Sequence, residues 1–188
     1  MLTLLLTSCV MTKTYTNEEK KMKLENETFL LIKNDGQKIS GQSLKLLPKS
    51  LIKIDDQEFK VIDVSAYQNK TAYFVKFGTP ENYVWTKQLK RGKINLYYYD
   101  VVTRKSYYNG SKYVNDDKTD THFVFSKNGE QLQELSITDI AERLKDNVNA
   151  FNKFKATFGE KDKKIFGRAL QNHPKVLFES IDIYNGNL

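Results

Sequence analysis

Acidic residues that could serve as a general acid and base occur as adjacent pairs, namely Glu18-Glu19, Asp55-Asp56 and Asp116-Asp117. Adjacent residues of a strand face opposite sides, and each pair is predicted in a turn or a polar tether. Acid–base catalysis needs carboxyl groups that converge from separate elements. The pairs therefore favour solvated turn residues over a catalytic centre.

Metal and nucleophile motifs give no stronger signal. The run from Asn115 to Asp120 is only superficially like a calcium loop, because it lacks the glycine and the distal glutamate and has Lys118 at a ligand position. His122 and His173 are far apart in the sequence. No HExxH, GxSxG or GxxxxGK[ST] motif occurs. We predict a non-catalytic protein with no metal and no cofactor.

Basic and tyrosine side chains alternate between residues 86 and 112, where Asp100 is the one acidic residue. On antiparallel strands, alternate tyrosines would line one face with cations beside them, a surface able to bind polyanions. Tyrosine is also a common strand residue and lysine a common surface residue. Polyanion binding is therefore the alternative function, with nucleic acid disfavoured, and its predicted residues are Lys87, Lys90, Arg91, Lys93, Tyr97, Tyr99, Arg104 and Lys105.

Cys9, the one cysteine of the chain, ends an apolar N-terminal stretch. Nine residues are too few to span a membrane, and an apolar start that ends at small residues is typical of a secretory signal. The run Leu6-Thr7-Ser8-Cys9 resembles the lipobox of bacterial lipoproteins. That resemblance implies that Cys9 begins the mature chain and carries fatty acyl groups such as palmitate. In the alternative interpretation, residues 2–6 form a buried strand and Cys9 is an inert thiol.

Residues 10–27 are polar and are predicted to form a tether, which could extend about 60 Å at roughly 3.3 Å per residue. Two or three acyl chains would hold the chain firmly on a membrane. The resemblance to Gram-negative lipoproteins implies an outer-membrane location, because Val10 stands where aspartate can signal inner-membrane retention.

Composition supports one folded domain behind that tether. The 188 residues are 39% hydrophobic and include 11 Tyr and 11 Phe, enough for a core. A single cysteine excludes an internal disulfide framework. The expected organisation is a signal remnant (1–8), a lipidated tether (9–27), a β-rich domain (28–136) and a helical segment packed on it (137–188).

Period-2 apolar runs separated by Asn-Gly and Asp-Gly turns predict an antiparallel β meander or small barrel, hence an α+β fold. We expect a turn at residues 34–36, one extended segment over 38–47, and hairpins around residues 55–57, 109–110 and 128–129. The following helix is predicted to be capped by Thr138, interrupted at residues 146–147 and ended by Gly159. Further helices are expected over 161–172 and from Pro174 to about residue 184.

Three runs in the β-rich part, Val64-Ser65-Ala66-Tyr67-Gln68, Tyr73-Phe74-Val75-Lys76 and residues 92–98, are similar to uncharacterised bacterial envelope lipoproteins with a helical C-terminus. The resemblance implies no activity and no catalytic residue. The leading hypothesis is a lipid-anchored envelope protein with a non-catalytic binding or structural role. Its partners would be the membrane at Cys9 and an envelope protein, glycan or lipid headgroup.

Overall fold

The computed structural model describes residues 28–134, 136–159 and 173–187. The predicted signal remnant, the lipobox with Cys9, the tether and the helix over 161–172 lie outside the described residues.

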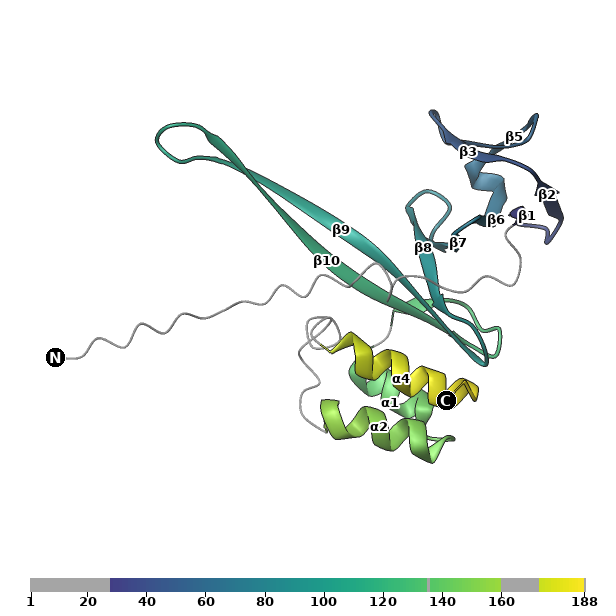
Figure 1. Cartoon of the computed structure of the whole chain (residues 1–188). Helices are drawn as coiled ribbons and strands as arrows, with labels where there is room; N and C mark the ends of the chain where they lie inside the picture. Colours follow the sequence, from purple (N-terminus) through teal and green to yellow (C-terminus); the bar gives the residue numbers. More distant parts are fainter. Residues whose placement is uncertain (1–27, 135, 160–172, 188) are drawn as a thin grey trace.

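Eight antiparallel strands form the main sheet, in the order β11-β10-β9-β8-β7-β6-β1-β2 (Figure 1). From β6 onward each strand pairs with the next along the chain, which is the predicted meander. The sheet stays open, so the barrel alternative is wrong and the α+β assignment is confirmed. Its strands are β1 (Phe29–Lys33), β2 (Lys38–Gly41), β6 (Val64–Asn69), β7 (Ala72–Gly78), β8 (Tyr83–Lys90), β9 (Ile94–Tyr108), β10 (Tyr113–Lys127) and β11 (Gln133–Glu134).

A second, three-stranded sheet contains β3 (Leu44–Leu47), β4 (Leu51–Ile54) and β5 (Gln57–Lys60), followed by a 3-10 turn over Val61–Asp63. The expectation of one extended segment over 38–47 is wrong. The chain leaves the main sheet because the Asp55 carboxylate accepts the backbone N–H groups of Gln42 and Ser43, each at 2.9 Å. Gly41 permits this approach, since a Cβ there would lie 2.5 Å from the same carboxylate.

The small sheet packs on one end of the main sheet around buried Leu31, Ile52, Ile54, Val61, Val64 and Tyr67. The ring of Tyr67 stacks on Phe74, with centroids 4.7 Å apart, and meets the edge of Trp85. Burial raises the pKa of Tyr67 to about 12. These aromatic contacts fix the β6–β8 part of the sheet.

Three helices of the described chain, α1 (Ile137–Leu144), α2 (Val148–Phe158) and α4 (Pro174–Asn185), lie beside the other end of the main sheet (Figure 1). The first begins at Ser136, whose hydroxyl and the Asp139 carboxylate form a capping box, so the prediction of Thr138 as the cap is wrong. The predicted interruption is confirmed, because Asn147 caps α2. Gly159 ends α2 as predicted, and α4 starts at Pro174.

The larger core joins these helices to the base of β9 and β10. Its fully buried members include Leu96, Leu144, Phe154, Leu177 and Ile181. Leu96 and Phe125 are cross-strand partners, so alternate residues of both strands face the helices. The remaining members of this core are Leu89, Ile94, Phe123, Phe125, Ile140, Ala150, Phe158, Phe178 and Tyr184.

The end of α4 is fixed to the start of β9 by one side chain. The Asn185 amide accepts from the backbone N–H of Ile94 and donates to its carbonyl, both at 2.9 Å. The turn before β9 also lies close to Asn185 and needs glycine at position 92, because a Cβ there would lie 2.4 Å from the Asn185 side chain. Beside it, Lys90 forms an ion pair with Asp182.

None of the helices in the described ranges is both long and apolar enough to cross a membrane.

Candidate functional site

Strands β9 and β10 form a single ladder of 15 residue pairs, from Ile94 opposite Lys127 to Tyr108 opposite Tyr113. Its register contains no shift along the whole length. The predicted Asn109-Gly110 turn closes it, with the Asn109 N–H donating to the Lys112 carbonyl at 3.1 Å. The two strands are therefore held as one continuous ribbon.

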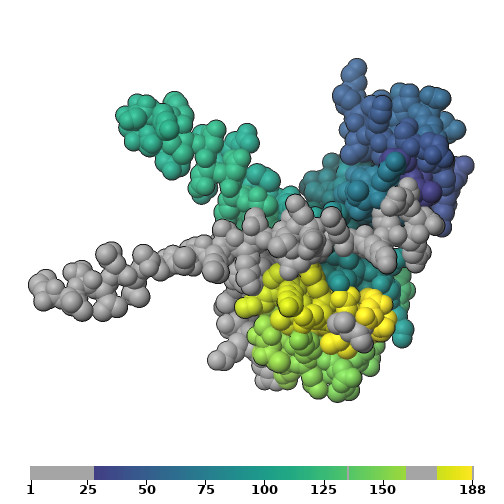
Figure 2. All heavy atoms as spheres, in the orientation of Figure 1, coloured from purple at the N-terminus to yellow at the C-terminus, as the bar shows by residue number. Residues whose placement is uncertain are grey.

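The outer part of this ribbon, residues 100–121, extends away from the body and is called the arm below (Figure 2). Its nine residues of β9 span about 30 Å at roughly 3.4 Å per residue. Side chains 100–113 and 115–119 are all exposed, although they alternate between the two faces. Apart from half-exposed Val114 and Asp120 and buried Thr121, the arm is therefore exposed to solvent on both faces.

Charges in the arm pair across the ladder. Arg104 donates two hydrogen bonds to the Asp117 carboxylate, at 3.0 and 3.1 Å, and these bonds raise the pKa of Arg104. On the other face, Lys105 lies opposite Asp116 in the register. The arm as a whole contains four basic and four acidic side chains, namely Arg104, Lys105, Lys112 and Lys118 against Asp100, Asp116, Asp117 and Asp120. Its net charge is zero.

The tip of the arm is aromatic. Tyr108 and Tyr113 pair across the ladder with ring centroids 5.4 Å apart, and Tyr107 lies on the opposite face. Tyr113 is 77% exposed, and Tyr107 and Tyr108 are each more than half exposed. Exposed tyrosines are the residues that protein interfaces use most readily as anchors.

Two edges of the arm lack a neighbouring strand among the described residues. The last residue of β9 with a partner in β8 is Tyr98, opposite Lys87. On the other side, β11 pairs with Val124 and Phe125 of β10, at the base. From residue 100 outward, neither strand of the arm pairs with a further strand of the described chain along its outer edge.

The alternation of hydrogen-bonded and non-hydrogen-bonded pairs along the ladder shows which backbone groups point to those edges. The pairs Asn109–Lys112 and Lys93–Asn128, which flank the ladder and share its register, are joined by backbone hydrogen bonds. Hydrogen-bonded and non-hydrogen-bonded pairs alternate in an antiparallel ladder. Even-numbered residues of β9 therefore turn their N–H and C=O groups outward, and Ile94 shows this directly by binding Asn185. In the arm, the outward residues of β9 are Asp100, Val102, Arg104, Ser106 and Tyr108.

The residues predicted to bind polyanions do not form one surface. Lys90 is paired with Asp182 and lies over the Phe178 ring, while Arg91 and Lys93 occupy the β8–β9 turn. Lys87 lies in β8 opposite Tyr98. Tyr97 is 6% exposed, and burial raises its pKa. Arg104 and Lys105 are in the arm, about 27 Å along β9 from the residue opposite Lys90, at roughly 3.4 Å per residue.

Tyr99, also predicted in that set, belongs to a small cluster at the base of the arm. Its ring stacks on His122, with centroids 4.9 Å apart, and both side chains contact the Glu134 carboxylate. Burial, followed by the nearby Glu134 charge, raises the pKa of Tyr99. The cluster fixes β11 to the two long strands.

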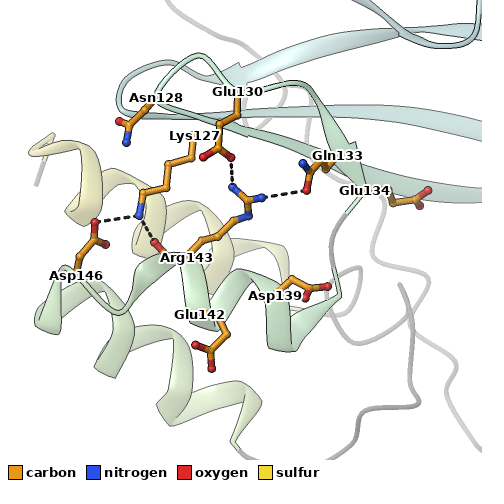
Figure 3. Close-up of a pocket in the computed structure, with 9 residues that line it drawn as sticks. All are labelled: Lys127, Asn128, Glu130, Gln133, Glu134, Asp139, Glu142, Arg143 and Asp146. Atoms are coloured by element: carbon orange, nitrogen blue, oxygen red, sulfur yellow. Dashed lines mark hydrogen bonds and ion pairs between the residues drawn. The ribbon is translucent and has the colours of Figure 1, made fainter.

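A hollow lined by polar and charged side chains lies between the β10–β11 connection and α1 (Figure 3). In it, the Lys127 ammonium donates to the Arg143 carbonyl at 2.8 Å and to Asp146 at 2.9 Å. Arg143 binds Glu130 and Gln133. The lining residues are Lys127, Asn128, Glu130, Gln133, Glu134, Asp139, Glu142, Arg143 and Asp146.

Each carboxylate of this hollow already has a partner. Glu130 binds Arg143, Glu134 binds His122, the Asp139 carboxylate accepts from the backbone N–H and hydroxyl of Ser136, and Glu142 pairs with Lys145. Asp146 accepts from Tyr184 and Lys127, and these bonds lower its pKa. The hollow is therefore a network that joins α1 and α4 to the sheet rather than a pair of carboxyl groups prepared for acid–base chemistry.

The Asp116-Asp117 pair, expected in a turn, instead lies inside β10, so that expectation is wrong. Asp116 and Asp117 face opposite sides of the ribbon, as adjacent strand residues must. Across the described ranges, no group of three or more His, Cys, Asp or Glu side chains could hold a metal ion.

Sequence reasoning missed Tyr113 and the acidic half of the arm. The available signal was symmetry about the Asn109-Gly110 turn. Counting equally outward from it places Tyr113 opposite Tyr108 and Asp117 opposite Arg104. Opposite charges at matched distances from a turn indicate a long hairpin.

No family model matches the chain, and no curated protein and no solved structure matches it either.

Proposed function

We propose that this chain is a non-catalytic binding protein of the bacterial envelope, held at the membrane by lipid on Cys9, and that its arm engages a partner protein. The lipobox-like run Leu6-Thr7-Ser8-Cys9 supports the location. The arm supports the binding role and is the observation that carries the proposal.

A two-stranded hairpin by itself is at best marginally stable in water, and the side chains of residues 100–113 and 115–119 in the arm are exposed. These exposed side chains include Tyr107, Tyr108, Tyr113, Val101 and Val102. Apolar groups gathered on one exposed segment are typical of an interaction site. Contact with a partner would bury these side chains on both faces.

A protein partner fits the arm better than a polyanion does. Polyanion binding needs a local excess of positive charge, whereas the arm has a net charge of zero and its Arg104 is bound to Asp117. Tyrosine anchors beside balanced charges are typical of protein interfaces.

The binding role can be tested by photo-cross-linking in bacterial cells that produce the full chain. A photoreactive residue in place of Tyr107 should give a specific protein adduct, whereas one at Val148, a 67% exposed site on α2, should not. Removing residues 101–106 together with 115–120 shortens the arm, retains the tip, and preserves both the register and the two faces. This shortened chain should lose the adduct. Equal adducts at Tyr107 and Val148, or an adduct that survives shortening, would contradict the proposal.

The anchor is tested separately. Cys9→Ala should release the protein from the membrane fraction, and intact-mass analysis of the natural protein should show acyl groups on a chain that starts at Cys9. Persistence of Cys9→Ala in the membrane fraction would remove the anchor but leave the arm experiment unaffected.

A further inference from the structure

We propose that the open edge of β9 in the arm binds an extended, acidic strand of the partner protein, which pairs with residues 100–108 and prolongs the position that β8 occupies at the base. This inference rests on the proposed function and specifies the chemistry of its partner.

The β9 edge of the arm lacks two of the usual protections of an exposed edge, a bulge and a proline, and is protected only by the charges of Arg104 and Lys105. Its register runs without a bulge, and the three prolines of the chain, Pro48, Pro80 and Pro174, all lie elsewhere. Soluble proteins normally block long edges with bulges, prolines or a covering element, because open edges recruit further strands. An unblocked edge about 30 Å long, at roughly 3.4 Å per residue, is suited to strand addition.

At the base of β9, the outward backbone N–H and C=O groups already have partners within the protein. Asn185 supplies an amide to the outward groups of Ile94, and β8 then pairs with Leu96, Tyr97 and Tyr98. Beyond Tyr98, no strand of the described chain pairs with this edge of β9. A partner strand would form hydrogen bonds there with Val102, Arg104 and Ser106, whose N–H and C=O groups point outward.

Composition favours the β9 edge over the β10 edge. Residues 101–108 of β9 read Val-Val-Thr-Arg-Lys-Ser-Tyr-Tyr, which are mostly strong strand formers. Residues 115–120 of β10 read Asn-Asp-Asp-Lys-Thr-Asp, which are mostly poor ones. The base of β10 is also occupied by Glu134, through its contact with His122.

Although the arm as a whole is neutral, residues 101–108 of β9 contain Arg104 and Lys105 and no acidic residue, so the strand that pairs with this edge is expected to be acidic. Arg104 uses two of its five N–H donors on Asp117 and can bridge to a second carboxylate on the other side of β9. Lys105 presents its ammonium on the opposite face. The structure also shows a strand that β9 accepts, because β10 places Asp117 and Asp116 opposite these two cations.

A second copy of the chain fits this edge less well. Two β9 edges paired antiparallel with full overlap of residues 100–108 would place Arg104 opposite Arg104. Pairing β9 with the β10 edge of a second copy in the intramolecular register would set the arms about 10 Å apart, two strand spacings, with both bodies on the same side. The body is much wider than the arm, so the two bodies would collide (Figure 2).

Two proline variants separate the edges. Ser106 and Asn115 are cross-strand partners joined by one side-chain hydrogen bond, and both turn their backbone N–H outward, toward the β9 edge and the β10 edge respectively. Ser106→Pro and Asn115→Pro therefore lose the same side-chain bond but block different edges. Circular dichroism would verify that both variants fold.

The probe is a labelled peptide with the sequence of residues 113–121, compared with a version in which both of its adjacent aspartates are lysine. Fluorescence anisotropy with the full chain should show binding of the acidic peptide and at least tenfold weaker binding of the lysine peptide. Ser106→Pro should weaken acidic-peptide binding at least tenfold, and Asn115→Pro less than twofold. Absent binding, equal binding of the two peptides, or equal loss in both variants would overturn the proposal.

If a proline variant fails to fold, peptides N-methylated at alternate residues test the same point on the unaltered chain. Peptides methylated on the backbone N–H groups that face β9 should not bind, whereas peptides methylated on the alternate groups should bind. Equal effects would overturn strand pairing.

A Tyr107 cross-link that survives in Ser106→Pro would refute edge pairing while leaving the binding role intact. Loss of the cross-link in Ser106→Pro and its retention in Asn115→Pro would support edge pairing. Self-association that Ser106→Pro abolishes would replace the acidic partner with a second copy.

Discussion

The inner and outer parts of the β9–β10 ribbon share one register but differ in their surroundings. At the base, Leu96 and Phe125 are buried under three helices, and Asn185 and β8 occupy the β9 edge. In the arm, side chains 100–113 and 115–119 are exposed, and neither outer edge pairs with a further strand of the described chain. The ladder continues into the arm without a core, because cross-strand pairs such as Arg104–Asp117 and Tyr108–Tyr113 stabilise it there.

This contrast separates two roles that one pair of strands performs. Residues at the base contribute to the stability of the whole domain, whereas residues in the arm contribute to local order and to surface chemistry. Substitutions matched in type but placed in the two parts should therefore differ greatly in effect.

The largest difference should appear between Leu96→Ala and Val102→Ala, which lie on the same face of β9. Leu96 is fully buried, so its truncation should lower the free energy of unfolding by about 3 kcal/mol. Val102 is exposed, so its truncation should change the free energy by about 0.5 kcal/mol or less. Urea unfolding measures both. Similar losses would show that the arm is part of the cooperative unit.

A smaller effect is expected at the amide that closes the β9 edge. Asn185→Ala removes two hydrogen bonds to Ile94 and should cost about 1–2 kcal/mol. Asn187→Ala, an exposed asparagine at the end of α4, is the matched control and should cost little. Thermal unfolding of the two variants tests this. An unchanged midpoint for Asn185→Ala would mean that β8 alone closes the base.

The smallest effect is expected in how the free energy of unfolding depends on acidic pH. Hydrogen bonds from Tyr184 and Lys127 lower the pKa of Asp146, so its carboxylate stabilises the fold above the ordinary pKa near 4, and this contribution is lost as pH falls through the lowered value. Because Asp146 is largely exposed, the contribution is small. Asp146→Asn should therefore flatten the decline in unfolding free energy as the pH falls. The same slope in Asp146→Asn and the unaltered chain would contradict this role.

Turns and helix ends could be predicted from local chemistry. The Asn109-Gly110 and Asn128-Gly129 turns and the helix ends at Gly159 and Gly186 depend on residues that tolerate positive φ, so the sequence signals them directly. The helix break at Asn147 was likewise visible, because asparagine favours caps over helix interiors.

Two errors arose where distant residues decide, and a third, the cap of α1, where a local pair of residues was overlooked. β2 ends at Gly41 because Asp55, 14 residues later, takes the next two N–H groups. Ser136 rather than Thr138 caps α1 because only Ser136 has its reciprocal partner, Asp139, at the third helical position. The acidic run 115–120 resembled a loop by composition, yet pairing with Arg104 and its neighbours keeps it extended.

The candidate site was predicted in part. Residues 86–112 were recognised as basic and tyrosine-rich, but only the register of the ladder shows that the carboxylates of β10 neutralise the cations of the arm. Membrane attachment at Cys9 stays a prediction, as does polyanion binding through the other basic residues of that set.

The bond between Asn185 and Ile94 also sets a time order for folding. The two residues are 91 positions apart, so at roughly 5–20 residues per second a ribosome needs about 5–20 s to supply the second after the first. Throughout that interval Leu96, Phe123 and Phe125 lack the α4 residues that cover them. Nascent chains are therefore expected to require a holding chaperone until α4 emerges, and chains truncated before α4 should be preferred targets of proteolysis.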